Sequence, residues 1–322
     1  MKTGKCLIIY NEPAEDALPD ELDVLDQVNF IDNTLQSLGY RVERRGITEN
    51  FFREIEEIAG DDIEFVFNLV ESVGQKAEIL YFIPALLNMH HIPYTGCPVE
   101  AAFVTGSKVL ARRIMKAHGI PVAGGYKVSE TDQLVPGKKY ILKPVWEDGS
   151  LGITEESVFT FDGTVPEIVR DKNDRHWFIE DFIDGREFNV SVKAGPEGPE
   201  VLPPAEMTFN GYPENMPRIV SWKAKWEEDT FQYDNSMRNF PDDLSDRLNR
   251  NIRDAVLGCW NTFGLKGYAR VDMRVDADEN VYVLEVNANP CISPDSGFIS
   301  AAAHAGYSHA ETISHIINDL NK

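Results

Sequence analysis

The sequence predicts an α/β protein in which an amino-terminal parallel sheet is followed by two smaller α+β units. In the first hundred residues, strand-sized apolar runs alternate with segments of helical periodicity. That order is typical of a parallel sheet with helices on both faces. Further along the chain, strand-sized runs are separated by turns that contain Gly and Pro, as in α+β units.

Each amino-terminal element has its own signal. Residues 6–10 form a short apolar run that predicts a buried strand. Apolar residues from Leu22 to Leu38 recur every three or four positions, which predicts a helix that ends at Gly39. Two strands and two helices follow in alternation: a strand at 41–44, a helix capped by Thr48, a strand at 63–70 and a helix at 78–88. Ligands of such sheets bind beyond the carboxyl ends of the strands, here residues 11–20 and 68–75.

The rest of the chain mixes both element types. The predicted elements are a helix at 108–118, strands at 125–128, 139–142, 157–161 and 177–183, hairpins at 186–201 and 267–286, and helices at 244–263 and 308–320. Residues 203–241 show little periodicity and are rich in Trp, Lys, Asn and Pro. A segment of that length without periodicity is more often functional than inert, so we expect an irregular lid there.

Composition limits the classes of function. The chain has 53 Asp and Glu against 31 Lys and Arg, a net charge of −22, which opposes binding to nucleic acid or anionic lipid. No apolar run is long enough to cross a bilayer. The four cysteines lie far apart, which argues against a disulfide framework or a zinc ribbon. We therefore expect a cytoplasmic protein with neither a membrane nor a nucleic-acid partner.

The most informative motif is a hairpin of two alternating strands joined by an Asp-Ala-Asp-Glu-Asn turn. Alternation places four polar side chains on one face: Arg270, Asp272, Glu285 and Asn287. If Val275 pairs with Tyr282, Asp272 lies directly opposite Glu285, and like charges at such positions need compensation. Two carboxylates and an amide oxygen suit Mg²⁺. The alternative is a solvated face on which arginines neutralise the acids.

Two weaker signals precede the hairpin. Lys143 ends an apolar strand and is followed by a loop, residues 147–152, that contains Ser150 and two glycines. The backbone N–H groups of such a loop can bind phosphate oxygens, and the lysine supplies positive charge. Glu180 and Glu187 flank an Asp-Gly turn, and on composition alone each reads as a surface acid.

Taken together, the order of these motifs resembles the ATP-grasp superfamily and, within it, the D-alanine–D-alanine ligase group. The resemblance runs from about residue 92 to the carboxyl terminus and includes the Ala-rich segment at 301–306. It implies an ATP-grasp fold with an amino-terminal parallel-sheet (pre-ATP-grasp) domain, residues 1–97, and two α+β subdomains that enclose the nucleotide, residues 98–184 and 185–322. It also implies ATP as the nucleotide and Mg²⁺, or alternatively Mn²⁺, as the metal.

The resemblance implies a role for each matching residue. The nucleotide would contact Lys108, Lys143, Glu180, Phe182, Ile183 and Glu187. The metal would be held by Asp272, Glu285 and Asn287. Catalysis would use Arg270 on the oxyanion, Lys225 on the γ-phosphate, and Ser150 in the loop over the phosphates. The substrate would meet Ser296 and Cys291.

The segments that bind the first D-alanine in that family differ here. The family's Gly-rich Ser-x-Glu segment is replaced by Asn-Glu-Pro-Ala-Glu-Asp, its His-Gly segment is missing, and Cys291 replaces the oxyanion-hole glycine. We therefore expect an ATP- and Mg²⁺-dependent ligase that joins a small-molecule carboxylate to an amine through an acyl phosphate. D-alanine is not the expected first substrate, and Glu12, Glu15 or Glu71 could receive a cationic or amino group.

Three alternatives stay open at the level of the sequence. The chain could be a nucleotide-binding regulatory protein of the same fold that has lost turnover. It could be a true D-alanine–D-alanine ligase, or an enzyme that uses a nucleophile other than an amine. The sequence names neither substrate, and it leaves a homodimer open.

Overall fold

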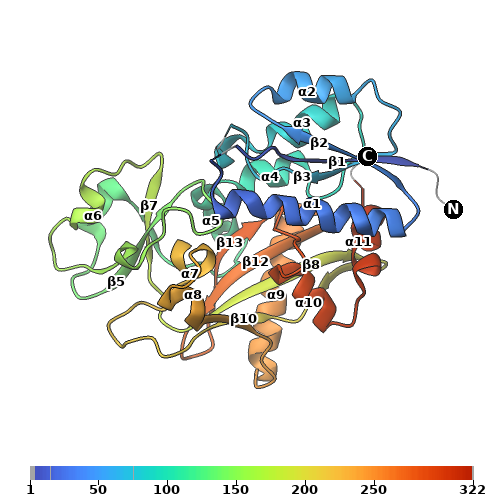
Figure 1. Ribbon diagram of the computed structural model, residues 1–322. Coiled ribbons are helices and arrows are strands. Elements are labelled where there is room, and N and C mark those ends of the chain that lie inside the picture. The colour runs from blue at the N-terminus through green and yellow to red at the C-terminus, as the bar shows by residue number, and fades with distance from the viewer. Residues whose placement is uncertain (1–3, 15, 75, 321–322) are drawn as a thin grey trace.

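The computed structural model describes residues 4–14, 16–74 and 76–320 and contains three sheets (Figure 1). The first sheet is parallel, in the order β2-β1-β3. Its strands are β1 (Lys5–Asn11), β2 (Arg41–Ile47) and β3 (Phe65–Leu69), and its helices are α1 (Pro19–Ser37), α2 (Phe51–Ile58) and α3 (Phe82–Met89). The predicted alternation of strands and helices around a parallel sheet is confirmed.

Two local predictions in this part need correction. Thr48 does not cap α2, whose N-cap is Asn50; instead its hydroxyl donates to Glu54 Oε1 at 2.6 Å. The helix predicted at 78–88 is split into a 3₁₀ turn (Ala77–Ile79) and α3. The periodicity that predicted α1 includes two exposed residues, since Leu22 and Leu25 are 46% and 40% exposed while Val24 and Gln27 beside them are buried.

The second sheet is antiparallel, in the order β4-β7-β5-β6. Its elements are β4 (Gly125–Lys127), β5 (Lys139–Pro144), β6 (Val158–Thr160), β7 (Trp177–Asp181) and the short helix α6 (Glu167–Arg170). Tyr140, Leu142 and Ile179 form the centre of its own small core. Lys143 on β5 and Glu180 on β7 lie on the opposite face of this sheet from that core, and both line a cavity.

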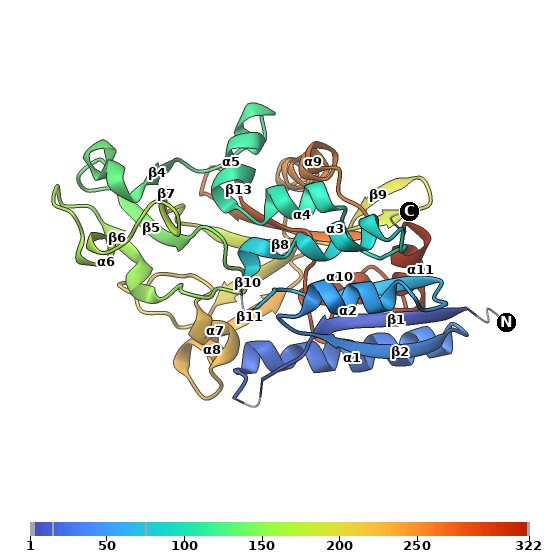
Figure 2. The ribbon, with the colours of Figure 1, turned by 90° about the horizontal axis from the view of Figure 1, so that it is seen from above.

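The third sheet has six strands in the order β11-β10-β8-β12-β13, with β9 beside β8. Its strands are β8 (Arg186–Gly195), β9 (Gly198–Val201), β10 (Ala205–Phe209), β11 (Ser236–Asn239), β12 (Tyr268–Val275) and β13 (Val281–Asn287). The prediction that residues 203–241 are irregular is therefore wrong at both ends, since β10 and β11 pair within this sheet. These strands are too short, at five and four residues, to give a readable period. Between them lie α7 (Trp222–Trp226) and α8 (Phe231–Asn235), beside the second sheet (Figures 1 and 2).

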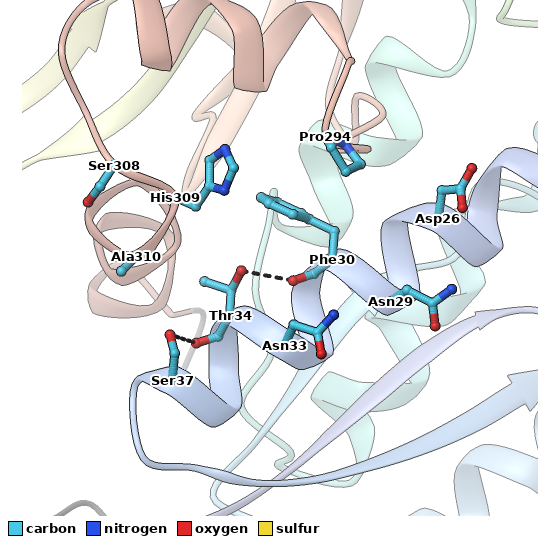
Figure 3. Close-up of a pocket in the computed structure, with 10 residues that line it drawn as sticks. All are labelled: Asp26, Asn29, Phe30, Asn33, Thr34, Ser37, Pro294, Ser308, His309 and Ala310. Carbon is cyan, nitrogen blue, oxygen red and sulfur yellow. Dashed lines mark hydrogen bonds between the residues drawn. The ribbon is translucent and has the colours of Figure 1, made fainter.

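Helices link these sheets into one body. The helices α4 (Val99–Thr105), α5 (Lys108–Ala117) and α9 (Asp246–Phe263) pack on the six-stranded sheet. Near the carboxyl end, α10 (Gly297–His304) and α11 (His309–Asn318) pack against α1 and the parallel sheet. In this contact the Phe30 ring meets the His309 ring edge-on at 4.8 Å between centroids (Figure 3). Within the described residues, the search for a helix long and apolar enough to span a bilayer finds none.

Candidate functional site

A cavity of about 300 Å³ lies between the antiparallel β4–β7 sheet and the six-stranded sheet. Every predicted site residue except Asn287 lines it. Asn287 lines an adjoining cavity of about 1030 Å³ that reaches the carboxyl ends of β1 and β3. Lys225, Arg270 and Cys291 line both cavities, so the two form neighbouring halves of one site.

The hairpin register confirms that Asp272 lies opposite Glu285 and Arg270 opposite Asn287. The register closer to the turn differs, since Val275 pairs with Val281 rather than with Tyr282. A β-bulge in the second strand absorbs this one-residue offset. The bulge also turns the apolar Leu284 toward the cavity, in line with the polar residues.

Asp272 is held from two sides. Arg270 donates through Nε and Nη2 to the two Asp272 carboxylate oxygens, both at 2.8 Å, and Asn287 Nδ2 donates to Asp272 Oδ2 at 3.1 Å. Burial raises the pKa of Asp272, and the Arg270 guanidinium opposes that effect. The amide oxygen of Asn287, the atom that a metal would use, takes no part in this contact.

Glu285 faces a cluster of cations. Its Oε2 lies 3.1 Å from Lys108 Nζ, which also contacts Asp148 Oδ1 at 2.9 Å. Burial alone would raise the pKa of Glu285, but the positive charges of Lys108, Lys143 and Arg270 outweigh it and lower that pKa to about 2. Burial alone would lower the pKa of Lys108, but Asp148 and Glu285 outweigh it and raise that pKa above its ordinary value. Lys108 and Glu285 therefore form an ion pair at neutral pH.

Lys143 and Glu180 form the opposite wall. Lys143 Nζ lies 2.8 Å from Glu180 Oε2, while the buried Glu180 Oε1 has no hydrogen-bond partner among the described residues. The lining of the same cavity includes apolar side chains: Ile141, Phe182, Ile183, Met207, Ile219 and Leu284. An apolar slot with one unsatisfied acceptor suits a flat ring that carries an N–H donor.

Arg274 holds the neighbouring acid in place. It donates to Glu187 Oε2 through Nε at 3.2 Å and Nη2 at 2.9 Å, and to the Ile183 carbonyl oxygen at 2.7 Å. Its guanidinium also lies over the Phe182 ring. The sequence interpretation considered Arg274 only as one of two arginines, with Arg270, that could neutralise the acids of the hairpin; in the structure it pairs with Glu187 on β8 instead.

The Gly-containing loop is covered by the segment between β10 and β11. Gly149 and Ser150 both have positive φ values, 65° and 66°, which let the loop turn back over the cavity. Ser150 Oγ donates to the Val220 carbonyl oxygen at 2.7 Å, and Trp226 Nε1 donates to the Gly149 carbonyl oxygen at 3.2 Å. Lys225, which directly precedes Trp226 in this segment, lines both cavities.

The end of the cavity near α10 carries the predicted substrate residues. Ser296 is the N-cap of α10, and its Oγ accepts from the Ile299 N–H at 3.3 Å. Cys291 Sγ lies 3.0 Å from Asp23 Oδ2. Burial, with the carboxylates of Glu71 and Asp23, raises the pKa of Cys291 well above its ordinary value. The thiol is therefore protonated at neutral pH and is a poor nucleophile.

The larger cavity is markedly acidic. Glu12 and Glu71 line it, as expected for a site at the strand ends, and Glu15 lies outside the described residues. Gln27 Nε2 donates to Glu71 at 2.9 Å and to Asp23 at 3.2 Å. Gln27 and Asp23 were missed because their spacing on α1 matches an ordinary helix surface.

A third cavity, of about 590 Å³, lies between α1 and the start of α11 (Figure 3). Among the described residues that line it, Asp26 is the only Asp, Glu, Lys or Arg side chain. It therefore lacks the paired cations and carboxylates of the central site, and we do not assign it a catalytic role.

Comparisons with known proteins point to one family and one fold. A family model described as D-ala D-ala ligase C-terminus matches residues 131–318, more than half of the chain. The D-alanine–D-alanine ligase of Actinobacillus pleuropneumoniae serotype 5b is 28% identical over 296 residues, which cover 89% of each protein. The crystal structure of the D-alanine–D-alanine ligase of Bacillus anthracis has a TM-score of 0.77 and 19% identity, and covers 98% of this chain and 97% of that one. The complex of that enzyme with ATP has a TM-score of 0.74 at the same identity and coverage.

Proposed function

Because this chain belongs to the D-alanine–D-alanine ligase family and is an ATP-dependent carboxylate–amine ligase with the ATP-grasp fold, we propose that it makes a dipeptide-like amide through an acyl phosphate. One observation carries the proposal. A single cavity is lined by six residues to which the sequence resemblance gives roles toward phosphate, metal or oxyanion: Lys108, Lys143, Lys225, Arg270, Asp272 and Glu285.

The nucleotide base is proposed to occupy the apolar slot beside Glu180. The unpartnered Glu180 Oε1 would accept a hydrogen bond from the exocyclic amine, and Glu187 would accept from the ribose hydroxyls. Lys108 and Lys143 would contact the phosphates, under the loop that contains Ser150. In the described structure both lysines are instead compensated by carboxylates, so phosphate would exchange with existing ion pairs.

The proposed metal site fits a hard cation. Among the described residues, no three His, Cys, Asp or Glu side chains converge as a metal site. We propose the amide oxygen of Asn287 as the third protein ligand, since the Nδ2 of the same amide donates to Asp272. Two carboxylates and an amide are oxygen ligands, as Mg²⁺ and Mn²⁺ prefer. When bound, the metal would offset the charge of the phosphates.

The chemistry follows from the poor electrophilicity of a carboxylate. Transfer of the γ-phosphoryl group to a carboxylate oxygen gives an acyl phosphate and ADP, and attack by an amine then forms the amide and releases phosphate. Arg270 lines both cavities, so its guanidinium would stabilise the oxygen of the tetrahedral intermediate. One such donor contributes roughly 10²- to 10³-fold in rate. The covering segment with Lys225 would exclude water, which otherwise hydrolyses the acyl phosphate.

The first substrate is proposed to differ from D-alanine, in contrast to the relatives named for that substrate. That half of the site is a large cavity lined by many carboxylates and by the thiol of Cys291, where the family's oxyanion-hole segment has glycine. Substrates that leave its polar groups unpaired would be discriminated against. Membership of a ligase family favours turnover over a purely regulatory role.

We also propose a division into residues 1–97, 98–184 and 185–322, since each range contains one of the three sheets. A cytoplasmic location is proposed because all four cysteines are free thiols. The partners would be small molecules, and a homodimer stays a prediction.

The test is a coupled assay of ADP release with Mg·ATP and a matrix of amino acids, dipeptides and hydroxy acids, with mass spectrometry of the products. We expect one carboxylate and amine pair to raise ADP release and to give an amide of the summed mass less water. ADP release without any condensed product across the matrix would contradict the proposal.

A further inference from the structure

Three arginines line the central cavity, and only two of them are neutralised. Arg270 and Arg274 each use two N–H groups on one carboxylate. Arg238, on β11, donates from Nη1 to the Asp295 carbonyl oxygen at 2.8 Å and to Ser300 Oγ at 3.1 Å, both neutral acceptors. Within the described part of the chain, Arg238 forms no ion pair with a carboxylate.

The unused edge of this guanidinium faces the start of α10. A Cβ atom placed on Gly297 would lie 3.6 Å from Arg238 Nε and 3.7 Å from Nη2. These are the two parallel donors of the arginine fork, and no hydrogen bond to either is found among the described residues. Gly297 contributes no side chain to this end of the cavity, which Arg238 and Ser296 also line.

Side chains of both signs of charge lie at this end of the cavity, but both hydrogen-bond acceptors found for Arg238 are neutral. The charge of Asp295 acts on Arg238 and raises its pKa, but Asp295 Oδ1 accepts from Ser293 Oγ at 3.0 Å, and only the Asp295 backbone oxygen accepts a hydrogen bond from Arg238. Burial and the positive charge of Arg270 both lower the pKa of Arg238. Arg238 and Arg270 therefore both line the central cavity, but among the described residues only Arg270 is paired with a carboxylate, that of Asp272.

We propose that Arg238 binds a carboxylate of the amine substrate through its Nε–Nη2 edge and thereby sets the specificity of the second half-reaction. An arginine fork matches the two oxygens of a carboxylate, with two parallel N–H···O bonds. Arg238 lies at the Ser296 and Cys291 end of the cavity, away from Lys143 and the base slot. The inference rests on the proposed ligase function and names the chemistry of its second substrate.

Two carboxylates of an amino acid are candidates for this contact, the α-carboxylate and an acidic side chain. Alanine against alaninamide tests the α-carboxylate, and aspartate against asparagine tests the side chain, each as the D and the L form. The measured quantity is the ratio of kcat/KM for acid over amide, from ADP release. This ratio does not depend on the fraction of folded enzyme, so a variant with reduced stability still gives an answer.

Arg238→Gln should reduce the acid-over-amide ratio for one of these pairs by roughly 10-fold, the lower end of the worth of a charged hydrogen bond, because Arg238 is exposed in the described structure. Arg238→Lys should restore part of it, because the charge remains while the fork is lost. The matched control is Arg53→Gln, since Arg53 is 83% exposed on α2 and lies outside both cavities. The KM for ATP should stay unchanged in all variants.

Equal acid-over-amide ratios in wild type and Arg238→Gln would overturn the inference and leave the ligase function standing. A raised KM for ATP with an unchanged ratio would also overturn it, because Arg238 would then serve the phosphates. If no amine stimulates ADP release, the ligase proposal fails, and the inference is decided by calorimetric titration of the Mg·ADP-bound protein with aspartate and asparagine. Tighter binding of aspartate in wild type than in Arg238→Gln supports the contact, and equal or absent binding refutes it.

Discussion

Replacing Glu285 by Gln separates a metal ligand from a merely structural acid. The change removes one negative charge and one strong oxygen ligand but keeps the size of the side chain. The apolar face of the hairpin, with Val271 and Met273 fully buried, is untouched. We therefore expect the fold to persist and the effect to appear in nucleotide binding.

The structure sets the size of this effect. Burial alone would raise the pKa of Glu285, but Lys108, Lys143 and Arg270 lower it from 4.5 to about 2. At about 1.4 kcal/mol per pH unit, the net shift, with the cost of burial included, favours the ionised carboxylate by about 3 kcal/mol. In Glu285→Gln these cations lose that partner, so metal-free ATP should bind more tightly than in wild type. Mg·ATP should bind roughly 10- to 100-fold more weakly, because a charged ligand of the metal is gone.

The assay is isothermal titration with a non-hydrolysable ATP analogue, in Mg²⁺ and separately in EDTA. The matched control is Glu57→Gln, because Glu57 is 53% exposed and far from the cavity lining. Opposite changes in the two buffers are the expected signature of a metal ligand. Equal Mg·ATP affinity in wild type and Glu285→Gln, or the same loss of affinity in both buffers, would refute the metal assignment.

Three further outcomes are expected. Limited proteolysis should cut residues 210–235 in the protein alone, and Mg·ADP should suppress this cleavage. Ser150→Ala, which removes the hydrogen bond to the Val220 carbonyl oxygen, should speed cleavage severalfold. Identical cleavage with and without nucleotide would argue against a lid. D-alanine alone should not give the highest kcat/KM in a panel of amino acids, dipeptides and hydroxy acids, and a clear preference for it would identify an ordinary D-alanine–D-alanine ligase. Because the pKa of Glu285 is lowered in the folded protein, the stabilising effect of its charge is complete above pH 4.5 and is lost as the pH falls toward 2. Over that interval the free energy of unfolding, measured by urea titration, should therefore fall by about 3 kcal/mol more in wild type than in Glu285→Gln. Parallel losses in the two proteins would contradict the lowered pKa.

Patterns within single elements predicted the site well. The alternation of β12 and β13 placed Arg270, Asp272 and Glu285 on one face, and the structure confirms the Asp272–Glu285 pair. The bulge next to this pair could not be read from the sequence, because a one-residue insertion leaves both strands with a normal alternation. It moved Leu284 to the polar face, where it helps to line the cavity.

Contacts between distant segments were harder to predict. Arg238 appeared in a stretch without periodicity, and only its pairing on β11 against β10 brings it to α10. The bond from Ser150 to Val220 joins residues 70 positions apart, and nothing local in either segment signals it. Short strands and loops of this kind take their structure from tertiary packing, which propensity and pattern do not encode.

The most direct test of the account follows oxygen from the carboxylate to phosphate. The protein is incubated with Mg·ATP, an amine and a substrate in which both carboxylate oxygens are ¹⁸O, and the released phosphate is analysed by mass spectrometry. An acyl phosphate requires that one ¹⁸O atom per amide formed appears in phosphate, because the amine displaces phosphate with the substrate's oxygen attached. Phosphate without ¹⁸O, alongside amide formation, would contradict the proposed reaction.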